Sequence, residues 1–251
     1  MKDSTEWIAY FKDNLTKQRI DWTLTPCISN EERATIIRSV QAWQLGETSD
    51  GANLIKASTL YAGQVKDADY VDAIKLFIKE EQKHGENLGK YLDAIGEKRL
   101  TRDWGDTLFR KVRYINTSME IWTITVIIVE SFAQLYYKSI SNATSCLLLK
   151  QICEDILIDE AHHIRFQLER LCIITSARSE WMHQMIVSGY RMFFYVIFLA
   201  IWTGHGKAFQ AGGLPFRRLL TKSLWKFNFI TARLGHYHKE FRIQKFQSIT
   251  V

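Results

Sequence analysis

Proline is nearly missing from this chain of 251 residues, which contains only Pro26 and Pro215. A proline inside an α-helix removes a backbone hydrogen bond and clashes with the preceding turn. The proline-free stretch 29–203 can therefore form a set of long helices. Sustained alternation of apolar and polar residues between turn signals, the pattern of β-strands, is missing as well. The sequence predicts an all-α protein.

Paired cysteines are also missing. The four cysteines show no C-x-x-C spacing and stand at Cys27, Cys146, Cys153 and Cys172. This spacing excludes a rubredoxin-type iron site, which needs two close pairs. We expect free thiols and no secretory leader, and therefore a reducing, cytoplasmic location. Attachment to the periphery of a membrane stays open because of the basic segment described below.

Charge is unevenly distributed along the chain. The net charge is +6, but residues 205–251 alone hold nine Lys and Arg against a single acid, Glu240. The remainder of the chain is therefore slightly acidic. The basic character belongs to the C-terminal segment.

Two copies of the pattern Glu-x-x-His are present, and each follows an isolated glutamate in an apolar helical stretch. Residues three apart on an α-helix share a face, so the Glu and His of one pattern can bind the same metal ion. One Glu from each of two helices, with Glu-x-x-His from each of two others, is a dinuclear carboxylate ligand set. The predicted metal ligands are Glu47, Glu81, His84, Glu130, Glu160 and His163.

The spacing of the four glutamates supports this prediction independently. The first two lie equidistant from a predicted turn at 65–67, and the last two from a predicted turn at 142–145. In antiparallel helices joined by a short loop, such residues lie at the same height. Both pairs should therefore meet at mid-helix in the core of a bundle.

Each predicted ligand also occupies a position on a mainly apolar stripe with helical periodicity, such as Ile74, Phe77, Glu81, His84 and Leu88. An ionised carboxylate in such a position costs several kcal/mol unless it is paired or bound to metal. Four converging carboxylates need positive charge between them, which two divalent ions supply.

Two other sets of residues compete with the predicted metal ligands. Asp159 and His162 repeat the second pattern one residue earlier, but Glu160 and His163 continue the apolar stripe. Glu120 competes with the third-helix glutamate, but ten residues along a helix place it on another face. The other histidines lack carboxylates at ligand spacing and are not predicted as ligands; they include His183, His205, His236 and His238.

A second sphere of hydrogen bonds is predicted around the imidazoles, because a metal-bound histidine usually donates its other N–H to a carboxylate or a carbonyl. Asp159 is positioned to accept from His84, and Glu80 from His163 by the pseudo-symmetry of the two motifs. The alternative is that both are ordinary acids beside a ligand.

Three parts are expected along the chain: a helix and link over 1–28, the bundle over 29–176, and an apolar helix plus a basic amphipathic helix, packed on the bundle, over 177–251.

Within the bundle, a capping box from Ser29 to Glu32 opens the first helix, predicted to run unbroken to about residue 64. Asp67 is predicted to cap the second helix and Gly96 to end it. The third and fourth helices are predicted over 105–139 and 143–176.

The apolar helix is predicted over 180–203, ended by Gly204-His205-Gly206. Its apolar run of about a dozen residues is too short to span a bilayer, which needs about 20, so we expect it to cover the bundle. A basic amphipathic helix is predicted over 214–234. Binding to an anionic membrane or to RNA, and a homodimer surface, remain open for its basic residues Arg217, Arg218, Lys222 and Lys226.

Over residues 31–176 the ligand pattern resembles the ferritin-like di-iron carboxylate superfamily, whose fold is an antiparallel four-helix bundle. Ferritins usually lack the second histidine ligand, here His163, and rubrerythrins carry an additional glutamate where this chain has Ala133. In size and ligand spacing the chain is most similar to the aldehyde-deformylating oxygenases.

The resemblance implies two bound iron ions, with manganese as an alternative. It implies that Glu81 and Glu160 bridge the metals, that Glu47 and Glu130 are terminal, and that each ion has one histidine. It further implies that dioxygen is used to oxidise a small, largely apolar substrate with electrons from an external donor.

Two other functions remain open: an iron-handling or peroxide-scavenging protein without an organic substrate, and an RNA- or membrane-associated hydroxylase. Trp43 and Tyr137 lie close to predicted ligands and could carry electrons, although packing in the core is the favoured role.

Overall fold

The computed structural model describes residues 1–105, 107, 118–176 and 178–249, without the side chains of 180 and 236–249. No strand occurs in this part of the chain, and the all-α prediction is confirmed. In order, the elements are α1 (Ser4–Leu15), α2 (Asn30–Glu32), the π-helical η1 (Arg33–Ile37), α3 (Arg38–Glu47), α4 (Ala52–Val65), α5 (Asp69–Ala94), α7 (Met119–Ala143), α8 (Leu147–Thr175), α9 (Glu180–Ala211) and α10 (Phe216–Ile249).

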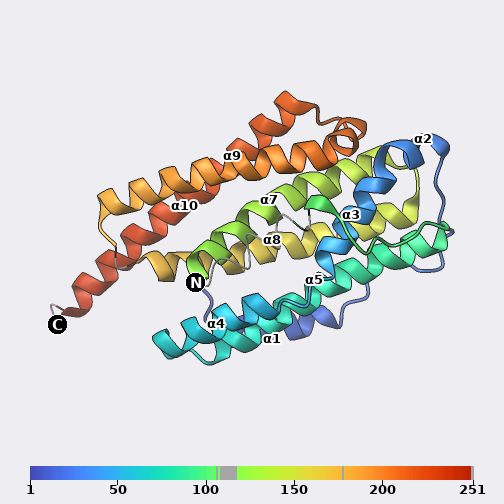
Figure 1. The fold of residues 1–251 in the computed structure, drawn as a ribbon. Helices are drawn as coiled ribbons and strands as arrows, with labels where there is room; N and C mark the ends of the chain where they lie inside the picture. Colours follow the sequence, from blue (N-terminus) through green and yellow to red (C-terminus); the bar gives the residue numbers. More distant parts are fainter. Residues whose placement is uncertain (106, 108–117, 177, 250–251) are drawn as a thin grey trace.

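An antiparallel bundle forms the centre of the molecule, as predicted. Its first helix is the succession α2–η1–α3–α4, followed by α5, α7 and α8. Figure 1 shows α1 beside α5 on one side of the bundle, and α9 and α10 as an outer layer beside α7 and α8 on the other. The four cysteines are free, as expected.

The first bundle helix is broken, and the expectation of an unbroken helix is wrong. The capping box is present, with the Glu32 N–H donating to Ser29 Oγ and the Ser29 N–H to Glu32 Oε2. The helix stops at Glu47 and resumes after Gly51, whose φ of +66° is in the left-handed region. The Asp50 carboxylate accepts a hydrogen bond from the backbone of the new helix, which competes with helix continuation. The break follows directly after a predicted metal ligand.

Helix α5 ends as expected, with Gly96 at a φ of +75° and the Glu97 N–H bonded back to the Leu92 carbonyl. The predicted side-chain cap by Asp67 is wrong. Its carboxylate instead accepts from Ser4 Oγ on α1 at 2.7 Å and from Arg170 on α8 at 2.8 Å.

The apolar helix α9 is longer than predicted and continues through Gly204-His205-Gly206 to Ala211. A tertiary contact compensates for the weak helix formers: His205 Nδ1 lies 2.8 Å from Ser39 Oγ. Within the same helix, the Trp202 ring covers Gly206, where a Cβ would lie 3.1 Å from it. The chain then turns at Gly212, where a Cβ would overlap the Ser139 backbone. Helix α10 also extends past the predicted end at 234.

Two helices in the described part of the chain, α7 and α9, are long and apolar enough to cross a membrane by length and composition. Helix α7 is mostly buried in the bundle, whereas 28% of the apolar window of α9 is buried. The expectation that the apolar segment of α9 is too short to span a bilayer is therefore wrong.

The other boundaries differ modestly. Helix α8 begins at Leu147, four residues later than predicted. The predicted start of the third helix borders residues 106 and 108–117, which lie outside the described part; α7 is described from Met119.

Apolar core residues leave a gap at mid-bundle. Along α5 they stop at Ile78 and resume at Leu88. Between them lie Glu80, Glu81 and His84. The apolar residues on either side of this gap belong to two core clusters. The helices thus carry a polar layer through the middle of the core.

Gly85 allows close approach at this layer. A Cβ there would lie 2.8 Å from Thr48 Cγ2 and 3.1 Å from Glu47 Cβ. We predict that Gly85→Ala lowers the free energy of unfolding by about 1–3 kcal/mol because it overpacks the α3–α5 contact. Gly63→Ala on α4 is the control, since its Cβ would meet nothing within 4 Å. Thermal unfolding of both variants checks this, and equal melting temperatures would contradict it.

Candidate metal centre

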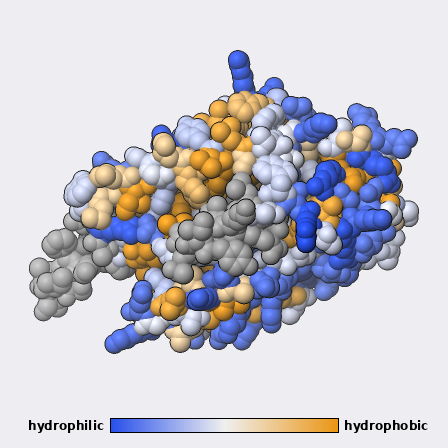
Figure 2. Space-filling model, viewed as in Figure 1, coloured by the Kyte–Doolittle hydropathy of each residue, from blue (hydrophilic) through white to orange (hydrophobic). Residues whose placement is uncertain are grey.

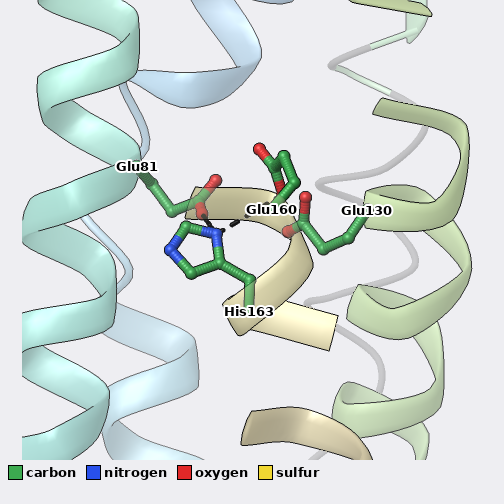
Figure 3. A group of neighbouring side chains, drawn as sticks. All are labelled: Glu81, Glu130, Glu160 and His163. Atoms are coloured by element: carbon green, nitrogen blue, oxygen red, sulfur yellow. Dashed lines mark ion pairs between the residues drawn. The ribbon is translucent and has the colours of Figure 1, made fainter. Parts of the chain in front are cut away.

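The six predicted ligands come together at one height of the bundle. Glu47 ends α3, Glu81 and His84 lie on α5, Glu130 on α7, and Glu160 and His163 on α8. All are buried except Glu81, which is partly exposed. Figure 3 shows the side chains of Glu81, Glu130, Glu160 and His163 pointing toward one another from three helices.

Two overlapping groups of ligand atoms form this centre. One atom from each of Glu81, Glu130, Glu160 and His163 lies within 4.8 Å of the others, and the same holds for Glu47, Glu81 and His84. Glu81 belongs to both groups. Glu160 lies between the imidazoles, 3.7 Å from His84 Nδ1 and 3.4 Å from His163 Nδ1. These positions suit the two glutamates predicted to bridge.

The predicted partners of the imidazoles are present. His84 Nε2 lies 3.1 Å from Asp159 Oδ2, and His163 Nε2 lies 2.9 Å from Glu80 Oε2. Because an ionised carboxylate only accepts hydrogen bonds, each Nε2 carries the proton. In the neutral imidazole, Nδ1 is then the atom with the lone pair, and it faces the centre.

Five buried polar atoms of this centre have no hydrogen-bond partner among the described residues: Glu81 Oε1, both carboxylate oxygens of Glu160, His84 Nδ1 and His163 Nδ1. Glu81 Oε1 is only 2.8 Å from His163 Nδ1, yet the pair lacks hydrogen-bond geometry. Buried polar atoms in proteins are normally paired. Oxygen and imidazole lone pairs aimed at shared points are the donor set of transition-metal ions, so the residues fit a dinuclear site. The ligand roles themselves stay a prediction.

The pKa values of the predicted ligands also indicate that the buried carboxylates need positive charge near them. Burial, followed by neighbouring carboxylates, raises the pKa of Glu47 and Glu130 well above the ordinary value. Burial also raises the pKa of Glu160 to about 7. For His163, burial lowers the pKa but the surrounding carboxylates, Glu81 first, outweigh it and raise the pKa well above the usual range. The metal-free centre therefore binds protons where metal ions would otherwise supply charge.

A residue outside the bundle completes the second sphere. Asn14 at the end of α1 is buried, and its Nδ2 donates to Glu80 Oε1 at 2.7 Å and to Asp159 Oδ1 at 2.8 Å. One amide thus joins the carboxylates that hold both imidazoles. Arg19 donates to Asn14 Oδ1 and pairs with Asp159 at 3.0 Å. Sequence reasoning missed Asn14 because no local signal links α1 to α8.

Cationic neighbours keep Asp159 ionised. Lys83 lies 3.6 Å from its carboxylate, in addition to Arg19. Burial acts to raise the pKa of Asp159, but the bonds to His84 and Asn14 and the charge of Lys83 hold it well below the usual range. Such a carboxylate accepts from His84 Nε2 at any ordinary pH.

Tyr137 belongs to the centre as well. It is buried on α7, and its Oη donates to Glu47 Oε1 at 2.7 Å. Trp43 stacks on Tyr136, with ring centroids 4.5 Å apart, and contacts Tyr137 edge-on. Tyr137 therefore orients a predicted ligand, and Trp43 contributes to the aromatic packing around it.

A cavity of about 450 Å³ is lined both by the carboxylates Glu47, Glu81 and Glu130 of the centre and by the exposed residues Trp104, Thr203 and Gly204, so it reaches from the carboxylates to the surface. Its lining is more apolar than polar. The apolar part includes Trp43, Phe77, Trp122, Val126, Val129 and Ile201, and the polar part includes Arg38, Asp50, Asn53 and Asp103.

The ligand assignment predicts metal stoichiometry. Glu81→Ala or His163→Ala should each remove at least one of two bound metal equivalents, measured by metal analysis after anaerobic loading with Fe(II) and dialysis. His162→Ala is the matched control, because its ring packs against Tyr10 on α1 and belongs to neither group of ligand atoms. Two retained ions in the His163 variant, with loss in the His162 variant, would show that the register is shifted by one residue.

The position of Asn14 predicts an effect on affinity. Asn14→Leu removes the shared donor and should weaken metal binding about 10- to 100-fold, as second-sphere changes do, in competition with a chelator. Lys17→Leu, which removes an exposed ion pair with Asp13 nearby, should leave the affinity unchanged. Equal affinities of the two variants would contradict the role of Asn14.

The raised pKa values predict a pH dependence. A carboxyl whose folded-state pKa exceeds its unfolded value near 4.5 stabilises the fold below pH 4.5 and loses this contribution as pH rises through the folded-state pKa, about 7 for Glu160. The raised pKa of His163 has the same sign. The melting temperature of the metal-free protein should therefore fall from about pH 5 to pH 8. Excess metal should raise it most at pH 8, because the ligands are then deprotonated; a metal effect independent of pH would contradict this.

Comparisons with known proteins identify the fold. No family model and no curated protein matches the sequence. Among solved structures, an R2-like ligand-binding oxidase variant with an aerobically reconstituted Mn/Fe cofactor is similar, with a TM-score of 0.67, 16% identity and coverage of 92% of this chain and 93% of that one. An R2-like ligand-binding oxidase without metal cofactor has a TM-score of 0.65 and 16% identity over 92% and 96% of the two chains.

At this identity the likeness establishes the fold alone. The expected particular similarity to aldehyde-deformylating oxygenases stays a prediction. The chain has a ferritin-like all-α fold, and its helices place carboxylate and imidazole groups consistent with a two-metal site at mid-bundle.

Proposed function

We propose that this protein binds two transition-metal ions through Glu47, Glu81, His84, Glu130, Glu160 and His163 and uses dioxygen to oxidise a small, largely apolar molecule. The observation that carries the proposal is the cavity that connects the carboxylates to the surface between apolar walls. A protein that only handles iron or removes peroxide needs access for small polar species and no apolar chamber of this size.

The donor set supports iron, with manganese as an alternative, because carboxylates with two imidazoles suit both. Two of the similar oxidase structures carry a reconstituted Mn/Fe cofactor, which supports the same pair of elements here. Six ligands leave coordination positions open, and such a metal pair supplies the capacity to bind dioxygen and transfer electrons to it. An external electron donor is part of the proposal.

The residues of this chain have separate tasks in the proposed reaction. Glu80 and Asp159 hold the protons on the two Nε2 atoms and so keep each Nδ1 available. Tyr137 fixes one oxygen of Glu47. The apolar cavity wall binds the substrate, orients it toward the carboxylate layer and excludes bulk water.

Gly46 offers a way to fill the cavity without touching a ligand. It lines the cavity on α3, and a Cβ there meets nothing within 4 Å. We predict that Gly46→Leu still binds two metal equivalents but binds no apolar compound in the cavity and forms no oxidised product from it. Gly63→Leu on the exposed surface of α4 is the matched control and should behave as the original protein.

The measurement is anaerobic loading with Fe(II), or with Mn(II) and Fe(II), followed by exposure to dioxygen and mass spectrometry of the extracted small molecules. The proposal requires dioxygen uptake together with an oxygen-dependent mass change in an apolar compound. Accumulation of many iron ions per chain, or peroxide removal with no bound organic compound, would contradict it and favour an iron-handling protein.

A further inference from the structure

Helix α9 presents a stripe of exposed apolar side chains. Its members are each more than half exposed and follow one another at helical spacing, so they lie on one face: Trp181, Met185, Met192, Val196 and Leu199. Figure 2 shows apolar side chains gathered over α9. Soluble monomers rarely expose contiguous apolar patches unless the patch binds something.

The stripe points away from the bundle. The opposite face of α9 is packed on α7, where Phe194 stacks on Phe132 with ring centroids 5.6 Å apart and Phe198 contacts the same ring. A third side of α9 is occupied by α10, through Phe194 with Phe227 and Phe198 with Phe216. The stripe is therefore the one long side of α9 for which the described part of the chain provides no cover.

Basic side chains accompany the stripe on the neighbouring helix. Residues 181–239 contain eight Lys and Arg and no Asp or Glu. On α10, Arg217, Arg218, Lys222 and Arg233 are exposed, with the exposed pair Trp225 and Phe229 among them. Lys226, grouped with them in the sequence analysis, differs: its Nζ donates to Gln134 on α7 and is largely buried.

We propose that the outer face of the α9–α10 pair, formed by the α9 stripe and the exposed basic and aromatic residues of α10, binds the surface of an anionic lipid bilayer. Apolar side chains on a helix enter the boundary between headgroups and acyl chains, and basic residues pair with anionic headgroups. The association lies in the plane of the interface, because the exposed Arg191 in the first half of α9 would otherwise enter the hydrocarbon.

The two other occupants fit less well. A second copy of this chain meeting the same face by two-fold symmetry would bury Arg217, Arg218 and Lys222 in an interface to which residues 181–239 bring no acidic partner. RNA binding would use the basic residues and base stacking on the exposed rings of Trp181, Trp225 and Phe229, but it would leave the Met, Val and Leu side chains of the stripe without an apolar partner.

This placement has a consequence that rests on the proposed function. Ala200, Thr203 and Gly204 of α9 line the cavity directly after Leu199 of the stripe. Trp104, half exposed, lies beside Gly204. A protein bound by this face therefore holds the cavity next to the bilayer, from which an apolar substrate is supplied. The binding itself requires neither metal nor activity.

The test is vesicle flotation with the full-length, metal-free protein, using phosphatidylcholine vesicles with and without about one third phosphatidylserine. We expect flotation that depends on the anionic lipid and on low salt. The triple variant Arg217→Ala, Arg218→Ala, Lys222→Ala should bind about a hundredfold more weakly, from about fivefold for each charge near such a surface. Val196→Ser with Leu199→Ser should also lose binding.

Matched controls keep the test specific. Lys12→Ala, Lys56→Ala, Lys79→Ala removes the same charge from exposed positions on α1, α4 and α5, and Leu60→Ser removes one exposed apolar side chain from α4. Both should float as the original protein does, and circular dichroism should show equal helix content in all variants.

Three results would overturn the proposal: no flotation with either vesicle, equal loss in the control triple variant, or a dimer that Leu199→Ser dissociates in the absence of vesicle binding. Salt-sensitive binding to single-stranded RNA without flotation would likewise overturn it. Failure of the flotation test leaves metal loading and oxygen chemistry untouched, so the two proposals are decided separately.

Discussion

Everything at the centre of this bundle follows from the mutual repulsion of carboxylates that the fold buries together. Glu47, Glu81, Glu130 and Glu160 approach one another at mid-bundle, where all but the partly exposed Glu81 are buried and water screens their charges poorly. Without metal, the molecule reduces this cost by holding protons, as the raised pKa values show. With two divalent ions, the same arrangement becomes favourable, because each charge gains a direct partner. The polar layer is therefore best understood as a site whose stability depends on what it binds.

The residues around the predicted ligands differ from them, because the charges of these surrounding residues are paired within the protein. Asp159 is paired with Lys83 and Arg19 and accepts from Asn14, and it holds the proton of His84 in place. Glu80 does the same for His163. The consequence is two imidazoles whose orientation and tautomer are set before any metal arrives, which reduces the entropic cost of binding. Helix α1 is thus part of the site, although it contributes no predicted ligand.

Much of this centre could be predicted from local pattern and symmetry. Helical periodicity places four predicted ligands on apolar stripes at matching distances from two turns, which makes them recognisable in the sequence: Glu81, His84, Glu160 and His163. The partnership of Glu80 with His163 followed from the same pseudo-symmetry. These features depend on one helix, or on two helices joined by a short loop, which is the range over which sequence spacing determines geometry.

What could not be predicted depends on contacts between distant segments. Asn14 reaches the site only because α1 docks in the groove of α5 and α8. The interruption of the first bundle helix before Gly51 contains residues that favour turns. The apolar stripe on both sides of it nevertheless favoured a continuous helix. Helix α9 continues through two glycines while His205 between them contacts Ser39 of the first bundle helix, a compensation that local helix propensity does not contain.

The most direct test of the account is the position of the metals themselves. Crystals of the protein loaded with iron or manganese should show two anomalous scattering peaks about 3.5–4 Å apart, as in other two-metal sites. One peak should lie at bonding distance from His84 Nδ1 and the other from His163 Nδ1, with Glu81 and Glu160 between them. A single peak, or peaks away from these six side chains, would contradict the account.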